Sequence, residues 1–282
     1  MLTAGKSGGG MEVGVLGCAG RMGRAVMAEI LASPDLRLAG AVEVPGHPAL
    51  GQDLGVLAGA EALGLVASDD AEGLVQRAAV VIEFSTPEAT AAHVALAAAH
   101  GTGHVIGTTG LSAAQEHTIR DAARRTALMR AANMSLGINL LLGLTEQVAR
   151  ALGPEAFDIE ILEMHHKHKV DAPSGTALAL GVAAARGRGV DLAAVADRGR
   201  DGLTGARETG AIGFAALRGG DVVGDHVVIF AGAGERIELT HRASDRRIYA
   251  RGALRAARWL HGRPPGLYGM AEVLGLAPAA GG

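Results

Sequence analysis

The first half of the chain alternates short β-branched runs with alanine-rich stretches of helical length, and this feature most constrains the fold. Such alternation is the pattern of βαβ units, in which helices join the strands of a parallel sheet. Strands are expected near residues 12–16, 37–44, 80–84, 104–106 and 127–130, and helices near 21–31, 87–100 and 112–125. Thr86 before Pro87, and Ser112 three residues before Gln115, are helix-start signals. The pattern predicts an α/β domain with a doubly wound parallel sheet.

The pattern changes after Asn133, which indicates a second domain. A leucine-rich segment covers residues 136–152, and a strand near 157–164 and a helix near 174–186 follow. Residues 211–240 alternate like strands, with glycines as turn residues, which predicts an open mixed, mostly antiparallel sheet in an α+β domain. A last helix near 244–260 is expected to return to the first domain. The predicted organisation is a flexible leader over 1–10, a first domain over 11–133 and 244–282, and a second domain over 134–243.

Composition excludes several classes of protein. The 282 residues are 49% hydrophobic and 20% charged, with a formal net charge of −3, which favours neither a disordered chain nor a basic nucleic-acid binder. No uncharged apolar run reaches the ~18 residues that a membrane span needs. The single cysteine, Cys18, allows no internal disulfide and no cysteine-built zinc site, and it fits the reducing cytoplasm.

A glycine-rich turn follows the first predicted strand and opens a helix. It reads Gly17, Cys18, Ala19, Gly20, Arg21, Met22, Gly23. Glycines let a backbone approach a pyrophosphate, and the free N–H groups of a helix start attract its charge. Glu43 ends the second strand 20 residues further on, where an acid can hold the ribose hydroxyls of a dinucleotide. A Rossmann-type dinucleotide-binding domain is therefore favoured over a turn without a ligand.

Two further loops follow predicted strands of the same sheet. One contains Gly107, Thr108 and Thr109, and the other contains Ala131, Ala132 and Asn133. In an open α/β sheet the ligand lies outside the carboxyl ends of the strands. Both loops are placed to contact the cofactor, although each alone would be an ordinary loop.

A dense cationic cluster lies between a strand and a helix of the second domain. His165, His166, Lys167, His168 and Lys169 precede a helix start at Pro173, Ser174, Gly175, Thr176. A solvated basic loop, a metal site and an anion-binding acid/base site are all open, but the lysines disfavour a bound cation. The helix start is a carboxylate receptor, and a nearby histidine can donate a proton near neutral pH. With a nicotinamide cofactor, this combination predicts hydride transfer to an unsaturated acid.

Several motifs together resemble one family. GCAGRMG, FSTPE, GTTG, AANMS, EMHHKHKVDAPSGTA, TGAIGFAALRGGDVVGDH and GERIELTHRASDR occur in order between about Glu12 and Leu274, as in the dihydrodipicolinate reductases, also called 4-hydroxy-tetrahydrodipicolinate reductases. HHKHKVDAPSGTA is highly specific. The resemblance implies reduction of a small cyclic dicarboxylate with NADH or NADPH in the diaminopimelate route to lysine, by a homotetramer that assembles through the open sheet.

The resemblance also implies a role for each matching residue. His165 is similar to the catalytic proton donor/acceptor, Lys169 to the catalytic proton donor and His166 to a substrate ligand, while Gly175 and Thr176 resemble the clamp on a substrate carboxylate. The positions that match cofactor-binding segments are Gly17, Cys18, Ala19, Gly20, Arg21, Met22, Glu43, Gly107, Thr108, Thr109, Ala131, Ala132, Asn133 and Met134. No metal is implied.

The chain departs from the family pattern at two positions that bear on cofactor choice. Val44 and Thr86 stand where some members carry basic residues suited to the extra phosphate of NADPH. Use of both cofactors, weighted toward NADH, is therefore expected. Two other functions stay open: a metal-dependent hydrolase with His165, His166 and His168 as ligands, and a dinucleotide-sensing protein without turnover.

Overall fold

The computed structural model describes residues 9–276. Residues 1–8, most of the expected leader, lie outside the described residues. The described residues form two compact units: unit 2 runs from Ser135 to Arg246, and unit 1 comprises the described residues on either side of it. The second division falls three residues later than the sequence suggested, because the strand before it continues to Ala243 and the last long helix begins only at Arg247.

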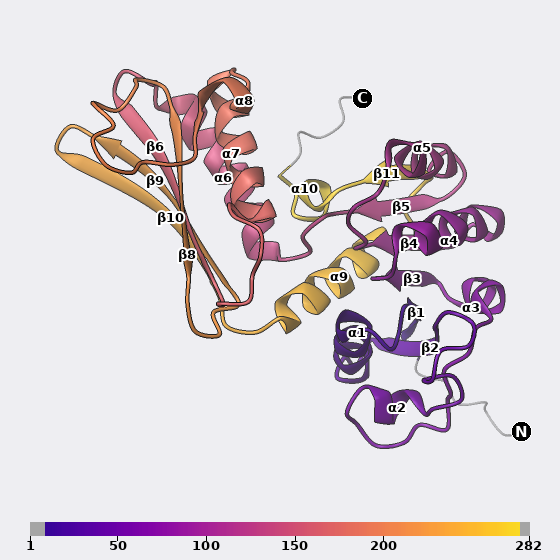
Figure 1. Ribbon diagram of the computed structural model, residues 1–282. Coiled ribbons are helices and arrows are strands. Elements are labelled where there is room, and N and C mark those ends of the chain that lie inside the picture. The colour runs from indigo at the N-terminus through magenta and orange to yellow at the C-terminus, as the bar shows by residue number, and fades with distance from the viewer. Residues whose placement is uncertain (1–8, 277–282) are drawn as a thin grey trace, which may run out of the picture. The chain divides into compact units, whose positions relative to one another are not determined.

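Unit 1 contains a six-stranded sheet in the order β11-β5-β4-β3-β1-β2, with every neighbouring pair parallel (Figure 1). Its strands are β1 (Met11–Leu16), β2 (Leu36–Val42), β3 (Val80–Glu83), β4 (Gly103–Ile106), β5 (Ala127–Arg130) and β11 (Gly266–Tyr268). Strand β2 ends two residues before the expected Val44, because the backbone N–H of Glu43 donates to Ser68 instead of continuing the ladder. The order confirms a doubly wound parallel sheet, since the chain winds outward from β1 in both directions.

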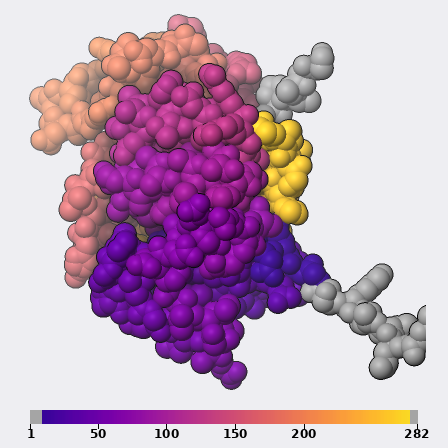
Figure 2. Space-filling view, turned by 90° about the vertical axis from the view of Figure 1, so that its right-hand side faces the viewer, coloured from indigo at the N-terminus to yellow at the C-terminus, as the bar shows by residue number. Residues whose placement is uncertain are grey.

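Helices cover both faces of this sheet. The helices are α1 (Arg21–Leu31), α2 (Leu54–Leu57), α3 (Ala71–Arg77), α4 (Pro87–His100), α5 (Ala113–Ala122), α9 (Arg247–Leu260) and α10 (Met270–Val273). Helices α1 and α9 pack together on one face, and α3, α4 and α5, drawn in violet to magenta, form the outer surface over the other (Figures 1 and 2). Thr86 and Ser112 accept hydrogen bonds from the first turns of α4 and α5, so the predicted helix starts are confirmed. Helix α5 ends three residues before the expected Arg125.

Unit 2 contains a five-stranded sheet in the order β10-β9-β6-β8-β7. Its strands are β6 (Phe157–His165), β7 (Ala196–Asp197), β8 (Ile212–Arg218), β9 (Gly224–Gly232) and β10 (Glu235–Ala243). Strand β9 pairs antiparallel with both neighbours, and β8 pairs parallel with β6 and β7. The antiparallel ladders are the longer ones, in agreement with the expected mixed, mostly antiparallel sheet.

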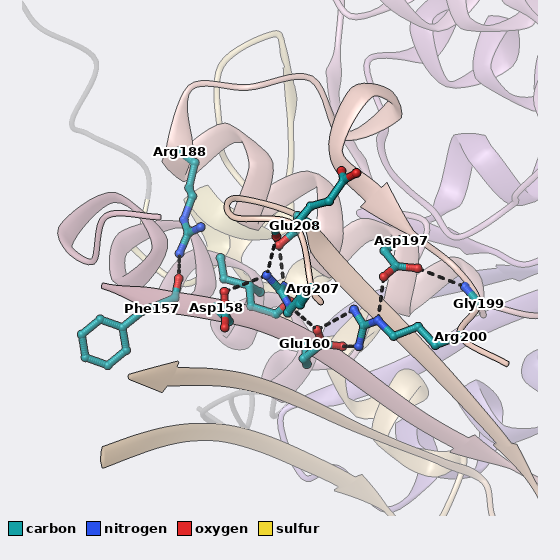
Figure 3. A network of polar contacts seen from close by, with 11 residues as sticks. Phe157, Asp158, Glu160, Arg188, Asp197, Gly199, Arg200, Arg207 and Glu208 are labelled. Carbon is teal, nitrogen blue, oxygen red and sulfur yellow. Dashed lines mark hydrogen bonds and ion pairs between the residues drawn. The ribbon is translucent and has the colours of Figure 1, made fainter. Parts of the chain in front are cut away.

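Two long helices cover one face of this sheet. Helices α6 (Leu136–Ala151) and α7 (Gly175–Arg188) pack on each other. Helix α7 contacts β6, β8 and β9, α6 contacts β10, and the short α8 (Leu192–Val195) follows α7. Phe230, Ile159 and Leu180 lie at the centre of the resulting core. On the opposite side, Glu160 of β6 accepts hydrogen bonds from Arg200 and Arg207, which hold residues 198–211 against the sheet (Figure 3).

Candidate functional site

The three glycines of the turn between β1 and α1 have different surroundings. Gly17 has a φ of +80°, and a Cβ there would lie 2.7 Å from the carbonyl oxygen of Phe84. A Cβ at Gly23 would lie 2.1 Å from the carbonyl oxygen of Gly17, so the close approach of helix and turn requires glycine. Gly20 has ordinary space for a Cβ, with its nearest contact at 3.5 Å. The fold itself therefore requires glycine at positions 17 and 23, whereas at Gly20 it leaves the space beside the turn open to a ligand.

Gly20 is also the N-cap of α1, and neither a capping side chain nor an acidic residue compensates the first turn, which contains Arg21 and Met22. Its N–H groups are left to bind an anion. The carboxylate of Glu43 accepts hydrogen bonds from the backbone N–H groups of Ala19, at 2.9 Å, and Val44, at 3.1 Å. Glu43 thus lies directly against the turn, where a ribose beside the pyrophosphate would be.

Cys18 is buried within the same turn. Burial, followed by the nearby charge of Glu43, raises the pKa of its thiol to about 11. A thiol that stays protonated at neutral pH is neither a nucleophile nor a metal ligand. Cys18 contributes to the turn through its backbone, because its N–H donates a hydrogen bond to the carbonyl of Val42.

A cavity of about 170 Å³ opens beside this turn, at the carboxyl ends of β1, β2 and β3. Val44, Pro45 and Ala89 give it apolar walls, and Glu43, Ser85 and His93 also line it. Apolar walls with a few polar groups are typical of a nucleoside site. The turn, Glu43 and the cavity together fit a dinucleotide.

The two other predicted loops follow β4 and β5. Gly107 packs against the ring of Phe84, which a Cβ would approach to 2.3 Å. The hydroxyl of the buried Thr108 accepts hydrogen bonds from the backbone of Ser85 and from Thr90, so this side chain ties the loop to α4. Thr109 is exposed beside it.

Ala131, Ala132, Asn133 and Met134 end unit 1's first segment. Of these four residues, Ala132 is exposed, and Met134 is buried against α9, where its carbonyl oxygen would lie 1.7 Å from a Cβ at Gly252. Both loops therefore lie at the carboxyl edge of the sheet, the same edge as the glycine turn.

A buried carboxylate that the sequence analysis did not single out lies behind the cavity. Glu83 accepts hydrogen bonds from Ser85, at 2.5 Å, and from Nδ1 of His93, at 2.7 Å. Nε2 of His104 lies 2.9 Å from its other oxygen. Burial opposes ionisation, but the contacts from His104 and His93 outweigh it and lower the pKa of Glu83 to about 2. Ser85 and His93 are in this way fixed at the cavity wall.

In unit 2, the candidate residues lie where the covered face of the sheet changes from apolar to polar. Alternate residues of β6 face α6 and α7: Ile159 and Ile161 first, and then Glu163 and His165. In β9 the register places Val228 opposite Ile161, and His226 opposite Glu163. The core therefore ends in a row of buried ionisable groups. Hydrogen bonds must compensate the loss of solvation that these groups undergo on burial.

Glu163 is the centre of this row. Its carboxylate accepts two hydrogen bonds of 2.8 Å from Arg218, one of 3.0 Å from the backbone N–H of Ser174, and one from Nδ1 of His165, at 2.5 Å. Burial would raise the pKa of Glu163, but the hydrogen bonds from Arg218 and His165 lower it further than burial raises it. An ionised Glu163 fixes the proton on Nδ1 of His165 and leaves Nε2 for exchange with a ligand.

The segment after β6 carries the remaining cations. Nζ of Lys169 donates to both oxygens of Asp171, at 2.7 and 3.0 Å, and this contact lowers the pKa of Asp171. Partial burial, with the charges of Arg246 and His168, lowers the pKa of His166 and favours its neutral form. The described residues contain no group of three or more histidine, cysteine or acidic side chains arranged to hold a metal ion.

Helix α7 begins directly beside Glu163. Ser174 is its N-cap and accepts a hydrogen bond from Ala177, while Gly175 and Thr176 form the first turn. A Cβ at Gly175 would meet nothing within 4 Å, so a ligand can approach the helix start freely. An anion there would receive N–H donors and the positive end of the helix dipole.

The structure thus places His165, His166, Lys169, Gly175 and Thr176 in one part of unit 2, and the predicted cofactor positions at one edge of the unit 1 sheet. The sequence analysis assigned no role to Glu163, Arg218, His226 or Glu83. The sequence did contain a signal for Glu163 and His226, because both continue the alternation of inward-facing residues along an otherwise apolar strand.

A glycine turn at the edge of a parallel sheet, together with a buried histidine–carboxylate pair on a second unit, is the arrangement of a two-unit oxidoreductase with a dinucleotide-binding domain. Two family descriptions match the chain: dihydrodipicolinate reductase, N-terminus, over residues 11–134, and dihydrodipicolinate reductase, C-terminus, over residues 137–274. The chain belongs to the dihydrodipicolinate reductase family, whose members use NAD(P)H.

Individual relatives agree with this assignment. A 4-hydroxy-tetrahydrodipicolinate reductase of Rhodopseudomonas palustris (strain HaA2) is 57% identical over 95% of this chain and 98% of its own length. One from Ruegeria sp. (strain TM1040) is 57% identical over 93% of this chain and 97% of its own length. Among solved structures, a dipicolinate-bound dihydrodipicolinate reductase from Paenisporosarcina sp. TG-14 shares the fold, with a TM-score of 0.74 at 24% identity over 93% of this chain and 98% of that chain.

Proposed function

We propose that this chain reduces 4-hydroxy-tetrahydrodipicolinate, or its dehydrated dihydrodipicolinate form, to tetrahydrodipicolinate with NADH or NADPH, in the diaminopimelate route to lysine. One observation carries the proposal: a buried imidazole, His165, is oriented by Glu163 beside the open N-terminus of α7. This places a proton carrier next to a carboxylate receptor. The names of the similar proteins supply the substrate.

Unit 1 is the proposed cofactor-binding unit. The N-terminus of α1, at Gly20, Arg21 and Met22, would hold the pyrophosphate, and Glu43 would accept hydrogen bonds from the ribose. The cavity beside Val44 would take the adenosine. The loops at 107–109 and 131–134 would lie nearer the nicotinamide, because they follow the next strands of the sheet.

Unit 2 is the proposed substrate-binding unit. Gly175 and Thr176 would hold one carboxylate of the substrate, and His166 would contribute a further contact. The bound nicotinamide supplies the hydride. The hydroxyl of the hydroxylated substrate leaves as water, which gives the conjugated carbon–nitrogen system. After hydride addition to that system, His165, through Nε2, and Lys169, through Nζ, deliver or organise the proton that completes the reduction.

NADH is the proposed preferred cofactor, with NADPH also used. Glu43 suits two free ribose hydroxyls but repels a 2′-phosphate. None of the described residues that line the cavity is a lysine or an arginine, and Asp69 adds a second carboxylate there. Arg24 lies nearby, where its Nε donates to the carbonyl of Ala19, so a partial counter-charge exists.

A homotetramer is the proposed assembly, built through the open face of the unit 2 sheet. That face has no covering helix among the described residues, and it carries Leu162 and Met164 of β6, Leu217 of β8, and Val227 and Ile229 of β9. A sheet face with this many apolar side chains is typical of a protein interface. The cytoplasm is the proposed location, in keeping with the single thiol of Cys18. Among the described residues, no helix has the length and apolar content of a membrane span.

The activity is tested by generating the unstable substrate in place, from pyruvate and aspartate semialdehyde with the condensing enzyme, and following nicotinamide absorbance. We expect oxidation of NADH that depends on every component and is unaffected by a chelator. Loss of turnover with the chelator would favour a metal-dependent hydrolase. Cofactor binding without any absorbance change would favour a sensing protein.

A further inference from the structure

Four buried polar residues of unit 2 form a closed cluster that links the proposed proton carrier to the proposed carboxylate receptor. They are Glu163, His165, Ser174 and His226, with exposed fractions of 1%, 9%, 2% and 4%. We call them the Glu163 cluster. Glu163 binds Nδ1 of His165 and the backbone N–H of Ser174, and His226 contacts both of those residues on its own side.

Each contact in the cluster restricts a different motion. The carboxylate of Glu163 fixes the rotation of the His165 imidazole and, through Ser174, the start of α7. Its remaining capacity is filled by the two hydrogen bonds from Arg218, whose Nη2 also donates to the carbonyl of Asp171. Because all acceptor sites of this carboxylate are occupied, it cannot move toward one partner without breaking a hydrogen bond to another.

His226 closes the cluster from the neighbouring strand. Its ring meets the ring of His165 edge to face, with centroids 5.1 Å apart, and its Nε2 lies 3.1 Å from the hydroxyl of Ser174. Burial and the adjacent His165 lower the pKa of His226 to about 4, so the ring is uncharged at neutral pH. An uncharged neighbour can pack against His165 in either protonation state without repelling it.

Gly224 leaves room at the other nitrogen of His165. A Cβ at this position would lie 2.9 Å from Nε2 of His165. The strand that supplies His226 therefore also keeps the exchanging nitrogen uncovered on that side.

We propose that Glu163 and His226 are positioning residues that hold His165 and the N-terminus of α7 in one fixed geometry, so that proton transfer and carboxylate binding depend on the same four contacts. This inference rests on the proposed function. It predicts a different effect for a substitution at each of three residues. A change at His165 should affect turnover, and a change at Thr176 should affect substrate binding. Loss of Glu163 should impair both.

The test compares Glu163→Gln with Glu146→Gln. Glu146 is a carboxylate of the same unit that is likewise hydrogen-bonded by arginine, from Arg150 and Arg186, but it lies beside the C-terminal end of α7, away from Ser174 at its start. For Glu163→Gln we expect kcat to fall roughly 100-fold and the Kd of dipicolinate, used as a stable aromatic probe, to rise about tenfold. NADH affinity should stay unchanged, and Glu146→Gln should leave all three quantities at the wild-type level.

His226 provides a second test if Glu163→Gln does not fold. Replacement by Leu removes the contact to Ser174, whereas Gln can place a polar group near the position of Nε2. We expect His226→Leu to lower kcat about tenfold and His226→Gln to restore most of it. Equal effects of the two replacements, or kcat and dipicolinate affinity in Glu163→Gln within about threefold of wild type, would overturn the proposal.

Dipicolinate binding and histidine ¹⁵N spectra keep this test separate from the activity itself. We expect His165 to carry its proton on Nδ1 in the wild type, and this tautomer to lose its dominance in Glu163→Gln. If the wild type fails to oxidise NADH but Glu163→Gln still loses dipicolinate affinity, the reductase function fails and the positioning role stands. An unchanged tautomer together with unchanged affinity overturns the positioning role.

Discussion

Gly20 and Gly23 lie three residues apart, yet a methyl group would have opposite effects at the two positions. Gly23→Ala places a Cβ against the carbonyl oxygen of Gly17, at a distance that backbone atoms cannot accept, and should cost about 2–3 kcal/mol of stability. Gly20→Ala meets only an ordinary contact and gives up a favourable N-cap residue, so we expect a much smaller loss of stability than for Gly23→Ala and an NADH Kd at least about tenfold higher. Thermal unfolding and cofactor titration of the two variants measure the contrast. Normal NADH binding by Gly20→Ala would remove the turn from the cofactor site.

Val44 is the residue at which cofactor choice can be changed. It lines the cavity beside Glu43 and is half exposed, so an arginine there has room to reach a 2′-phosphate. The wild-type kcat/KM for NADH should equal or exceed that for NADPH, and Val44→Arg should shift the ratio toward NADPH by about tenfold. Steady-state kinetics with both cofactors test this. A wild-type preference for NADPH above about tenfold would mean that another basic group binds the phosphate.

His165 and Thr176 should differ in which kinetic constant they control. His165→Gln or Lys169→Ala removes a group proposed to handle the proton and should lower kcat by about 100-fold with little effect on KM. Thr176→Val removes a hydroxyl beside the carboxylate receptor and should chiefly raise KM for the dicarboxylate. Initial rates at saturating NADH separate the two effects. His165→Gln with normal turnover and weakened binding alone would exclude His165 from proton transfer.

For single residues, the sequence identifies those that can transfer protons or bind ligands more readily than those that position them. His165 and Lys169 stand out because charged side chains crowd one short motif. Arg218 does not, because its partner Glu163 lies 55 positions away along the chain and only the pairing of β6 with β8 brings them together. Glu83 is hidden for the same reason, since His104 contacts it from the neighbouring strand and His93 from α4.

Among the elements, β3, β4 and α4 are joined through Glu83, and this junction predicts a dependence of stability on pH. The folded-state pKa of Glu83, about 2, lies below its ordinary value of 4.5, because His104 and His93 more than offset burial. A lowered pKa contributes stability that is complete above the ordinary value and is lost as pH falls through the folded value. Glu83→Gln should therefore be about 3 kcal/mol less stable at neutral pH, with a deficit that shrinks between pH 4.5 and 2.

Urea unfolding of wild type and Glu83→Gln across this range measures the difference, and Glu72→Gln is the matched control. Glu72 also faces a histidine, His100, at 3.3 Å, but the pair is largely exposed and should contribute little at any pH. A constant difference between wild type and Glu83→Gln down to pH 2 would show that the carboxylate charge is not what holds the junction together.

Elements with a local signal were predicted well, and elements defined by distant partners were not. Helix α4 occupies residues 87–100 as expected, because Thr86 and Pro87 mark its start and Gly101, in the left-handed region, ends it. Strand β11 was missed, since three residues carry no readable period and exist as a strand only through pairing with β5. Helix α3 was missed as well, although Asp70 caps it, because seven residues show too few turns for a 3.6-residue period.

At the scale of the whole molecule, the two faces of the unit 2 sheet are covered unequally. Helices α6 and α7 bury one face of its sheet, and no helix among the described residues covers the other face. Leu217 is 48% exposed on that open face, next to Met164 in the register of β6 and β8. In the proposed homotetramer, a second copy of the same surface would cover these apolar side chains.

Leu217→Glu should therefore break the assembly, because a carboxylate at the interface would lose its water without gaining a partner. The matched control is Leu63→Glu, the same change at a leucine of unit 1 with a similar exposed fraction, 43%. Light scattering after size exclusion should give the mass of four chains for wild type and Leu63→Glu, and a smaller mass for Leu217→Glu. Because the Glu163 cluster faces the helices on the opposite side of the sheet, Leu217→Glu should still bind dipicolinate if its unit remains folded. A wild type that elutes as a single chain, or Leu217→Glu that retains the mass of four, would exclude this face as the interface.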